Sequence, residues 1–196
     1  MSFETARGQG LPTLTQITGE LDKLTRRRRR RRSIFSFFGG FLMVLAMGVM
    51  VTLLFLPVLE VSGSSMEPTL RDGDVLLLKK PGRIRAGSLC GMYAQGRLIL
   101  KRIIALPGDV VDMDGAGTVF VNGQALSEPY VSGKCLGTCD VAFPFTVPEG
   151  SLFVMGDHRD TSIDSRSRLI GCVRLDQVMG QVVARIWPPN NLAWMG

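Results

Sequence analysis

The sequence predicts a mainly β protein, in which one N-terminal transmembrane helix precedes an antiparallel β-sheet domain with a small inserted lobe. Three observations lead to this fold class. A long segment without any charge ends at Leu59, short β-branched or apolar runs follow it, and turns rich in Gly and Pro separate those runs. With 196 residues, the chain has room for one modest domain besides the helix.

The N-terminal tail, residues 1–33, carries the basic surplus of the chain. Residues 1–32 hold nine basic and three acidic groups, which accounts for the whole net charge of +6. Seven consecutive arginines, Arg26–Arg32, dominate this tail. Alone, such a run could be a nuclear-targeting or nucleic-acid-binding patch. Its place directly before an apolar segment favours the flank of a membrane span instead, so we expect no nucleic-acid partner.

The uncharged segment predicts a transmembrane helix over residues 34–59. The 27 residues from Ser33 to Leu59 contain no charge. As a helix they would be about 40 Å long, enough to cross a hydrocarbon core of about 30 Å. The apolar part of a cleaved signal peptide is shorter, about 7–15 residues. The arginines should stay cytoplasmic, which places residues 60–196 on the outer side of the membrane.

The domain after residue 60 is predicted to consist of short strands joined by tight turns. An Asn-Gly pair between Val119 and Leu126 is a strong hairpin signal. An inserted lobe is expected over about residues 112–150. The predicted strands are Val75–Leu78, Leu98–Ile104, Val110–Val111, Thr118–Val121, Ser151–Met155 and Gln181–Ile186.

The four cysteines fit an exported compartment. Cys135 and Cys139 lie in a glycine-containing turn that could bring the two sulfurs together, so we expect a disulfide between them. Cys90 and Cys172 are interpreted as small buried hydrophobic residues, and a second bridge between them stays open. No metal site is expected, because neither a second close cysteine pair nor histidines complete a zinc set.

Ser65 and Lys101 are the residues on which a chemical function would depend. Ser65 lies in a Gly/Ser-rich turn, and Lys101 lies within an apolar run. A serine hydroxyl needs a base to become a nucleophile, and burial lowers the pKa of a lysine so that its amine can accept the proton. The single histidine, His158, leaves few ways to build a serine–histidine pair. Because Ser65 follows the span by six residues, it should work at the membrane surface.

Two further features support a catalytic site. Gly63 permits backbone conformations closed to other residues, and backbone N–H groups around Ser65 could form an oxyanion hole. A polar segment, Gly156–Arg166, follows an apolar strand and contains carboxylates and arginines that can form bidentate pairs. Within it, Ser162 is well suited to hold a lysine amine by hydrogen bonding.

Together these segments resemble the bacterial type I signal peptidases, the membrane-anchored serine–lysine leader peptidases. The resemblance covers residues 34–196 and rests on Ser-Met-x-Pro-Thr (65–69), Lys-Arg-x-x-x-Leu-Pro-Gly-Asp (101–109) and Gly-Asp-x-Arg-Asp-x-Ser-x-Asp-Ser-Arg (156–166). It implies that Ser65 is the nucleophile and Lys101 the general base. It also implies that Ser162 orients the lysine, while Asp157, Asp164 and Arg166 brace the site.

The resemblance further implies a substrate and a location. The expected activity is removal of signal peptides from exported preproteins, with small residues at positions −1 and −3 of a substrate bound as an added extended strand. No cofactor or metal is implied. The expected location is the bacterial inner membrane, with a single pass, a cytoplasmic N-terminus and a periplasmic or extracytoplasmic catalytic domain in contact with the bilayer.

Two positions depart from the family pattern. Some members use a serine hydroxyl as a second oxyanion donor where this chain has Gly63, so Ser62, Ser64 or backbone alone would have to serve. His158 replaces an asparagine, from which we expect no change in the catalytic chemistry. The alternatives are a dedicated relative that matures a pilin-like conjugation substrate, a soluble SOS-repressor-like autoprotease, and an inactive membrane scaffold. The uncharged span argues against the second alternative, and the intact Ser65 and Lys101 argue against the third.

Overall fold

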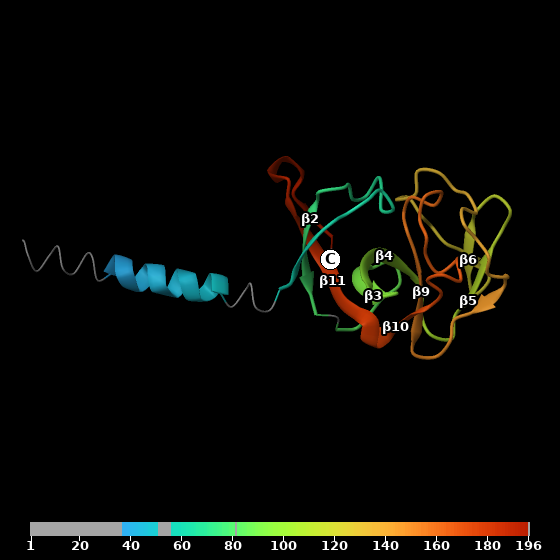
Figure 1. Cartoon of the computed structure of the whole chain (residues 1–196), viewed down its shortest axis with the longest axis horizontal. Coiled ribbons are helices and arrows are strands. Elements are labelled where there is room, and N and C mark those ends of the chain that lie inside the picture. The colour runs from blue at the N-terminus through green and yellow to red at the C-terminus, as the bar shows by residue number, and fades with distance from the viewer. Residues whose placement is uncertain (1–36, 51–55, 81, 196) are drawn as a thin grey trace, which may run out of the picture. The chain divides into compact units, whose positions relative to one another are not determined.

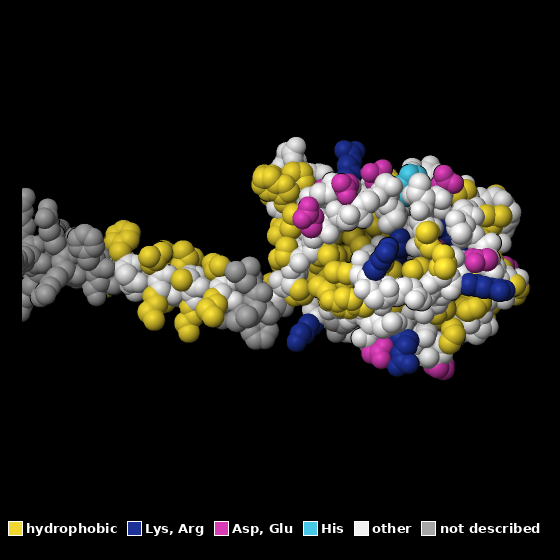
Figure 2. Space-filling view, viewed as in Figure 1, with side chains coloured by type: hydrophobic (Ala, Val, Ile, Leu, Met, Phe, Trp, Pro, Cys, Tyr) yellow, Lys and Arg dark blue, Asp and Glu magenta, His cyan; other side chains and the backbone are white. Residues whose placement is uncertain are grey.

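The computed structural model describes residues 37–50, 56–80 and 82–195. The chain divides into two compact units, Met1–Val51 and Thr52–Gly196. In the first unit, residues 37–50 form a helix that exposes large apolar side chains along its length (Figure 2). Phe37 is 80% exposed and Met43 is 72% exposed. A helix that is apolar on every side is stable only in apolar surroundings.

The predicted transmembrane helix lies only partly within the described residues. The tail 1–33 with its arginine run, residues 34–36 and residues 51–55 fall outside them. Of the helices that the structure does describe, none has both the length and the apolarity that crossing a bilayer requires. Val58 and Leu59, which we predicted to end this helix, instead belong to strand β1 (Val58–Glu60). Leu59 packs against the core of the second unit, and an apolar strand cannot be distinguished from a helix end by hydropathy alone.

The second unit is built from antiparallel β-sheets, as predicted. The larger sheet described has eight strands in the order β1-β2-β11-β3-β4-β9-β10, with β12 added on β11 (Figure 1). Within the described residues, the strand pairings of this sheet are all antiparallel. Two short 3₁₀ helices, Leu175–Gln177 and Pro189–Asn191, flank β11. Besides β1, the strands are β2 (Val75–Lys79), β3 (Leu89–Ala94), β4 (Arg97–Ala105), β9 (Ser151–Met155), β10 (Val173–Arg174), β11 (Val178–Trp187) and β12 (Ala193–Trp194).

A smaller sheet lies in the region where a lobe was expected. Its four described strands follow the order β7-β6-β5-β8, and β5 and β6 lie beyond β9 in Figure 1. The predicted hairpin is confirmed, because Asn122 and Gly123 join two paired strands with φ angles of +51° and +78°. Positive φ at both turn positions is what a two-residue type I′ turn requires. The strands are β5 (Val110–Met113), β6 (Val119–Val121), β7 (Gln124–Ala125) and β8 (Phe145–Thr146).

Phe153 joins the two sheets. It is fully buried on β9 and belongs to a core cluster that also contains Ile104 of β4 and Val111 of β5. The rings of Phe143 and Phe145 lie 6.3 and 5.9 Å from its own, centroid to centroid. Tilted aromatic contacts at this spacing add to the free energy gained by burying the rings. The smaller sheet is therefore fixed to the larger sheet by apolar packing.

We expect Phe153→Ala to lower the free energy of unfolding by about 3–5 kcal/mol, because it removes a buried ring and leaves a cavity between the sheets. Urea unfolding of the full chain in detergent, followed by circular dichroism, measures this loss. Leu169→Ala is the control, since Leu169 is 64% exposed and its truncation should cost about 0.5 kcal/mol or less. Equal midpoints for the two variants would contradict the packing role of Phe153.

Candidate active site

The centre of the site is the buried amine of Lys101. This residue lies on β4, with Cys90 of β3 as its cross-strand neighbour, and is only 4% exposed. Its Nζ donates a hydrogen bond of 2.9 Å to Oγ of Ser162, which is itself fully buried. Burial, helped by the positive charge of Arg166, lowers the pKa of Lys101 from its usual 10.5, although Asp164 and Asp157 oppose the shift. The amine is therefore placed to act as a proton acceptor.

Ser65 lies in a tight turn that connects β1 and β2. The N–H of Glu67 donates to the Ser64 carbonyl at 3.0 Å, and that of Leu70 donates to the Met66 carbonyl at 2.9 Å. Met66 is buried and anchors the turn in the core, while Ser65 is half-buried. Such a turn leaves the serine side chain within reach of a substrate.

Gly63 sets the backbone conformation just before Ser65. Its φ of +88° lies in the left-handed region that side chains disfavour. Its N–H donates to Oδ1 of Asp72 at 2.7 Å. Ser64, the next residue, is exposed. The N–H of Gly63 is thus already occupied, so it cannot serve as an oxyanion donor in this arrangement.

Gly156 brings the Ser65 turn and the Lys101 partner together. A Cβ atom at position 156 would lie 2.5 Å from the Ser65 carbonyl oxygen and would also collide with Oγ of Ser162. His158 fixes this close approach of the two segments, because its N–H donates to the Ser65 carbonyl at 3.1 Å. The backbone of Ser65 and the hydroxyl that holds Lys101 therefore both lie against the same glycine.

Asp164 and Arg166 form a buried pair beneath Ser162. Nε and Nη2 of Arg166 donate to the two carboxylate oxygens of Asp164 at 2.8 and 2.9 Å. Oδ2 of Asp164 also accepts the N–H of Gly156 at 3.0 Å. Nη2 of Arg166 reaches the Ser162 carbonyl at 3.3 Å. The bidentate pair thereby holds the backbone of both Gly156 and Ser162 in place.

Asp157 joins the strand of the lysine to the turn of the serine. Its carboxylate accepts two hydrogen bonds from Arg102, Nε at 2.8 Å and Nη2 at 2.6 Å. It accepts a third from Oγ1 of Thr69 at 2.6 Å. Arg102 follows Lys101 on β4 and stacks on the ring of Tyr130 at 3.8 Å. Asp157, Asp164 and Arg166 therefore all take part in the hydrogen-bond network around Gly156 and Ser162.

Some residues of this network were not predicted. Arg159 and Glu128 form a buried bidentate pair that links the lobe to the loop Gly156–Arg166, and Nε of Arg159 donates to the Gly156 carbonyl at 3.1 Å. Arg102 was noted only as part of a motif. The position of Arg102, a charged residue inside an apolar strand, could have indicated its role in the sequence. Glu128 has no comparable feature in its surrounding sequence.

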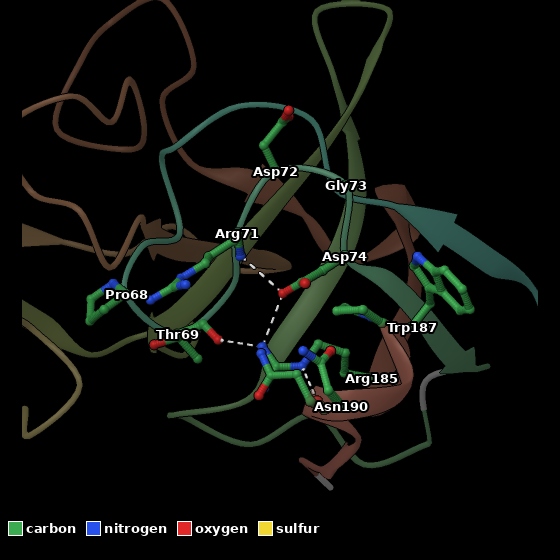
Figure 3. A pocket seen from close by; sticks show the side chains of 11 residues that line it. Pro68, Thr69, Arg71, Asp72, Gly73, Asp74, Arg185, Trp187 and Asn190 are labelled. Carbon is green, nitrogen blue, oxygen red and sulfur yellow. Dashed lines mark hydrogen bonds and ion pairs between the residues drawn. The ribbon is translucent and has the colours of Figure 1, made fainter.

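The other side of the serine turn borders a cavity of about 680 Å³ (Figure 3). Arg185 of β11 lies in its wall and donates to Asp74 at 3.0 Å and to the Thr69 carbonyl at 3.2 Å. Its Nε donates to the Asn191 carbonyl at 2.7 Å. Arg185 therefore ties the end of β11 to the turn that carries Ser65.

The predicted disulfide is not present in the structure. Cys135, Cys139, Cys90 and Cys172 are all free thiols. The thiol of Cys139 is directed at the Val141 carbonyl, 3.6 Å away, rather than at Cys135. Burial raises the pKa of Cys90 to about 12 and that of Cys172 to about 11. Cys90 is buried as interpreted, whereas Cys172 is only half-buried and packs at the edge of a core cluster. Within the described part of the chain, no group of acidic, histidine or cysteine side chains could hold a metal ion.

Comparison with known proteins assigns the family. The family model described as signal peptidase, peptidase S26, matches residues 34–187. The chain belongs to this family. A signal peptidase I of Bacillus licheniformis is 37% identical over 146 residues, which cover 67% of this chain and 77% of that protein. A signal peptidase IB of Staphylococcus aureus is 33% identical over 148 residues, which cover 65% and 76%.

Among solved structures, a signal peptidase I of Enterococcus faecalis is similar with a TM-score of 0.42 and 30% identity. The match covers 51% of this chain and 97% of that one.

We expect Gly156→Ala to reduce catalysis by about 100-fold, because the added methyl group displaces the Ser65 carbonyl and the hydroxyl that holds Lys101. The rate of single-turnover cleavage measures the loss. Gly150→Ala is the control for overall folding, since a Cβ there meets no atom within 4 Å, although its φ of +71° adds strain. Native rates in Gly156→Ala would contradict the close approach at this glycine.

Proposed function

We propose that this chain is a membrane-anchored serine endopeptidase that removes N-terminal signal peptides from exported preproteins with a Ser65/Lys101 dyad. The observation that carries the proposal is the buried Lys101 amine, bonded to Ser162 beside the Ser65 turn. Membership of the signal peptidase family and the names of the relatives support the substrate class.

The proposed reaction follows from the protonation state of the amine. Neutral Lys101 takes the proton of the Ser65 hydroxyl as Oγ attacks the carbonyl carbon of the scissile bond. The ammonium then gives this proton to the leaving amine as the peptide bond breaks. A water molecule, deprotonated by Lys101, hydrolyses the acyl-enzyme and restores Ser65. Ser162 keeps the amine oriented throughout, and the Asp164–Arg166 pair keeps Ser162 in place.

The specificity that we propose is for small residues at positions −1 and −3, on a substrate bound as an extended strand. Its support is the match of all three sequence motifs to the family pattern. A general enzyme of this kind processes many precursors, whereas a dedicated pilin-maturing enzyme processes one.

We further propose that the chain is anchored in the bacterial inner membrane through its uncharged segment, with the arginine run in the cytoplasm. The charge asymmetry around the segment supports this orientation. The exposed apolar surface of the helix at residues 37–50 supports an apolar environment for it.

We expect the purified protein in detergent to cleave a panel of preproteins after small-x-small sites, and Ser65→Ala and Lys101→Met each to abolish cleavage. Met keeps the length and apolar stem of Lys101 but lacks the amine. Because activity needs the neutral amine, the native rate should rise with pH through the lowered pKa of Lys101 and level off below 10.5. Gel assays of precursor and product over a pH series measure this. Full turnover by either variant would refute the dyad.

We expect protease added to intact spheroplasts to digest the region after residue 60 and to leave an N-terminal fragment that contains the arginine run. An epitope tag at each end, followed by immunoblotting, identifies the protected part. A cytoplasmic marker protein controls for lysis. Protection of the C-terminal tag in intact spheroplasts would reverse the proposed orientation.

A further inference from the structure

His158 contacts the backbone on both sides of Ser65. Its N–H donates to the Ser65 carbonyl at 3.1 Å, and Nδ1 of its ring lies 3.3 Å from the Ser64 carbonyl oxygen. We propose that the His158 imidazole is a positioning residue that orients the Ser64–Ser65 peptide as the oxyanion donor of the reaction. This inference rests on the proposed function and adds a residue to its machinery.

The chemistry of the contact fixes the role of the ring nitrogen. A carbonyl oxygen can only accept a hydrogen bond, so Nδ1 must carry the hydrogen and act as the donor. Nδ1 is therefore engaged by the backbone and is not placed to take a proton from Ser65. His158 thus acts through the peptide, and Lys101 remains the base.

The geometry of a peptide carries the effect from the carbonyl to the N–H. The Ser64–Ser65 bond is trans, so its N–H points away from the carbonyl that His158 holds. The Ser65 N–H donates to no described residue, which leaves it available to a substrate oxygen. The Ser64 carbonyl already accepts the N–H of Glu67 at 3.0 Å. The second hydrogen bond, from His158, further restricts the direction of the Ser65 N–H and polarises it, because hydrogen bonds in a chain strengthen one another.

The composition of the turn makes this one donor important. Gly63 has no hydroxyl, and its N–H is already bonded to Asp72 at 2.7 Å. Ser64 is exposed to solvent. With these neighbours, the Ser65 N–H is the backbone donor nearest the nucleophile that remains uncommitted among the described residues. If this N–H is misaligned, it should stabilise the developing negative charge of the oxyanion less well.

His158 is itself held firmly enough to position a neighbour. Its carbonyl accepts the N–H of Ser162 at 3.1 Å. Asp157, the preceding residue, is fixed by two hydrogen bonds from Arg102. Arg159, the following residue, is buried and paired with Glu128. The imidazole therefore projects from a backbone that both neighbouring side chains anchor.

The test compares three substitutions of His158 in the full chain, in detergent, with one preprotein as substrate. His158→Phe keeps a ring but has no donor, and His158→Ala is a second variant without a donor should Phe prevent folding. His158→Asn offers an amide N–H in place of the Nδ1 hydrogen. We expect kcat to fall about 3- to 10-fold in the His158→Phe and His158→Ala variants, with KM unchanged. A loss of this size corresponds to one neutral hydrogen bond. The His158→Asn variant should recover most of the lost kcat. The backbone contact from His158 N to Ser65 remains in all three.

Controls separate this inference from the proposed function. Asp160→Asn alters an exposed residue of the same loop and should leave kcat and Tm unchanged. Native kcat in the Phe and Ala variants, a loss confined to KM, or failure of Asn to recover kcat would each overturn the positioning role. If the native protein cleaves no preprotein while its Tm is normal, the proposed function itself fails, and the inference fails with it.

Discussion

A buried amine held by a buried hydroxyl is the interaction on which the site depends. Lys101 lies on an interior strand of the larger sheet and is only 4% exposed, and Ser162 is the partner of its hydrogen bond. Burying an ammonium there is costly, so the pKa of Lys101 is lowered from its usual value. In the mechanism that we propose, this amine is the base, and no histidine is needed. Gly156 lies against both the Ser162 hydroxyl and the Ser65 carbonyl, so the loop Gly156–Arg166 also positions the turn that carries Ser65.

Three arginines hold this loop in its conformation, and each is paired with a carboxylate. Arg102 holds Asp157, Arg159 holds Glu128, and Arg166 holds Asp164. Such pairs are weak contributors to net stability, because desolvation offsets their attraction, but they specify geometry. Removal of one partner leaves a buried charge and costs about 3–5 kcal/mol. The site therefore tolerates replacement of a whole pair better than replacement of one member.

Much of the fold and the site could be predicted from the sequence. The Ser151–Met155 strand and the Asn122-Gly123 hairpin follow from local patterns, and both are present. Strand β3 was missed because Cys90 and Gly91 interrupt its apolar pattern. Gly91 nevertheless fits there, since a Cβ would lie 2.9 Å from the end of the Leu78 side chain on β2 and would force that side chain to shift. Close packing of this kind depends on residues far apart in the chain, and no local pattern contains it.

The approach of the lobe to Arg166 has a consequence for variation among related chains. Nη1 of Arg166 donates to the Leu136 carbonyl at 2.7 Å, and a Cβ at Gly137 would lie 2.8 Å from the same nitrogen. The cysteine-containing turn thus contributes a main-chain oxygen, not a side chain, to the support of the catalytic loop. At this turn, homologous lobes can differ in sequence provided that some backbone carbonyl ends at this point in space. Superposed backbones should therefore show whether a homologous turn keeps this contact, whereas a sequence alignment does not.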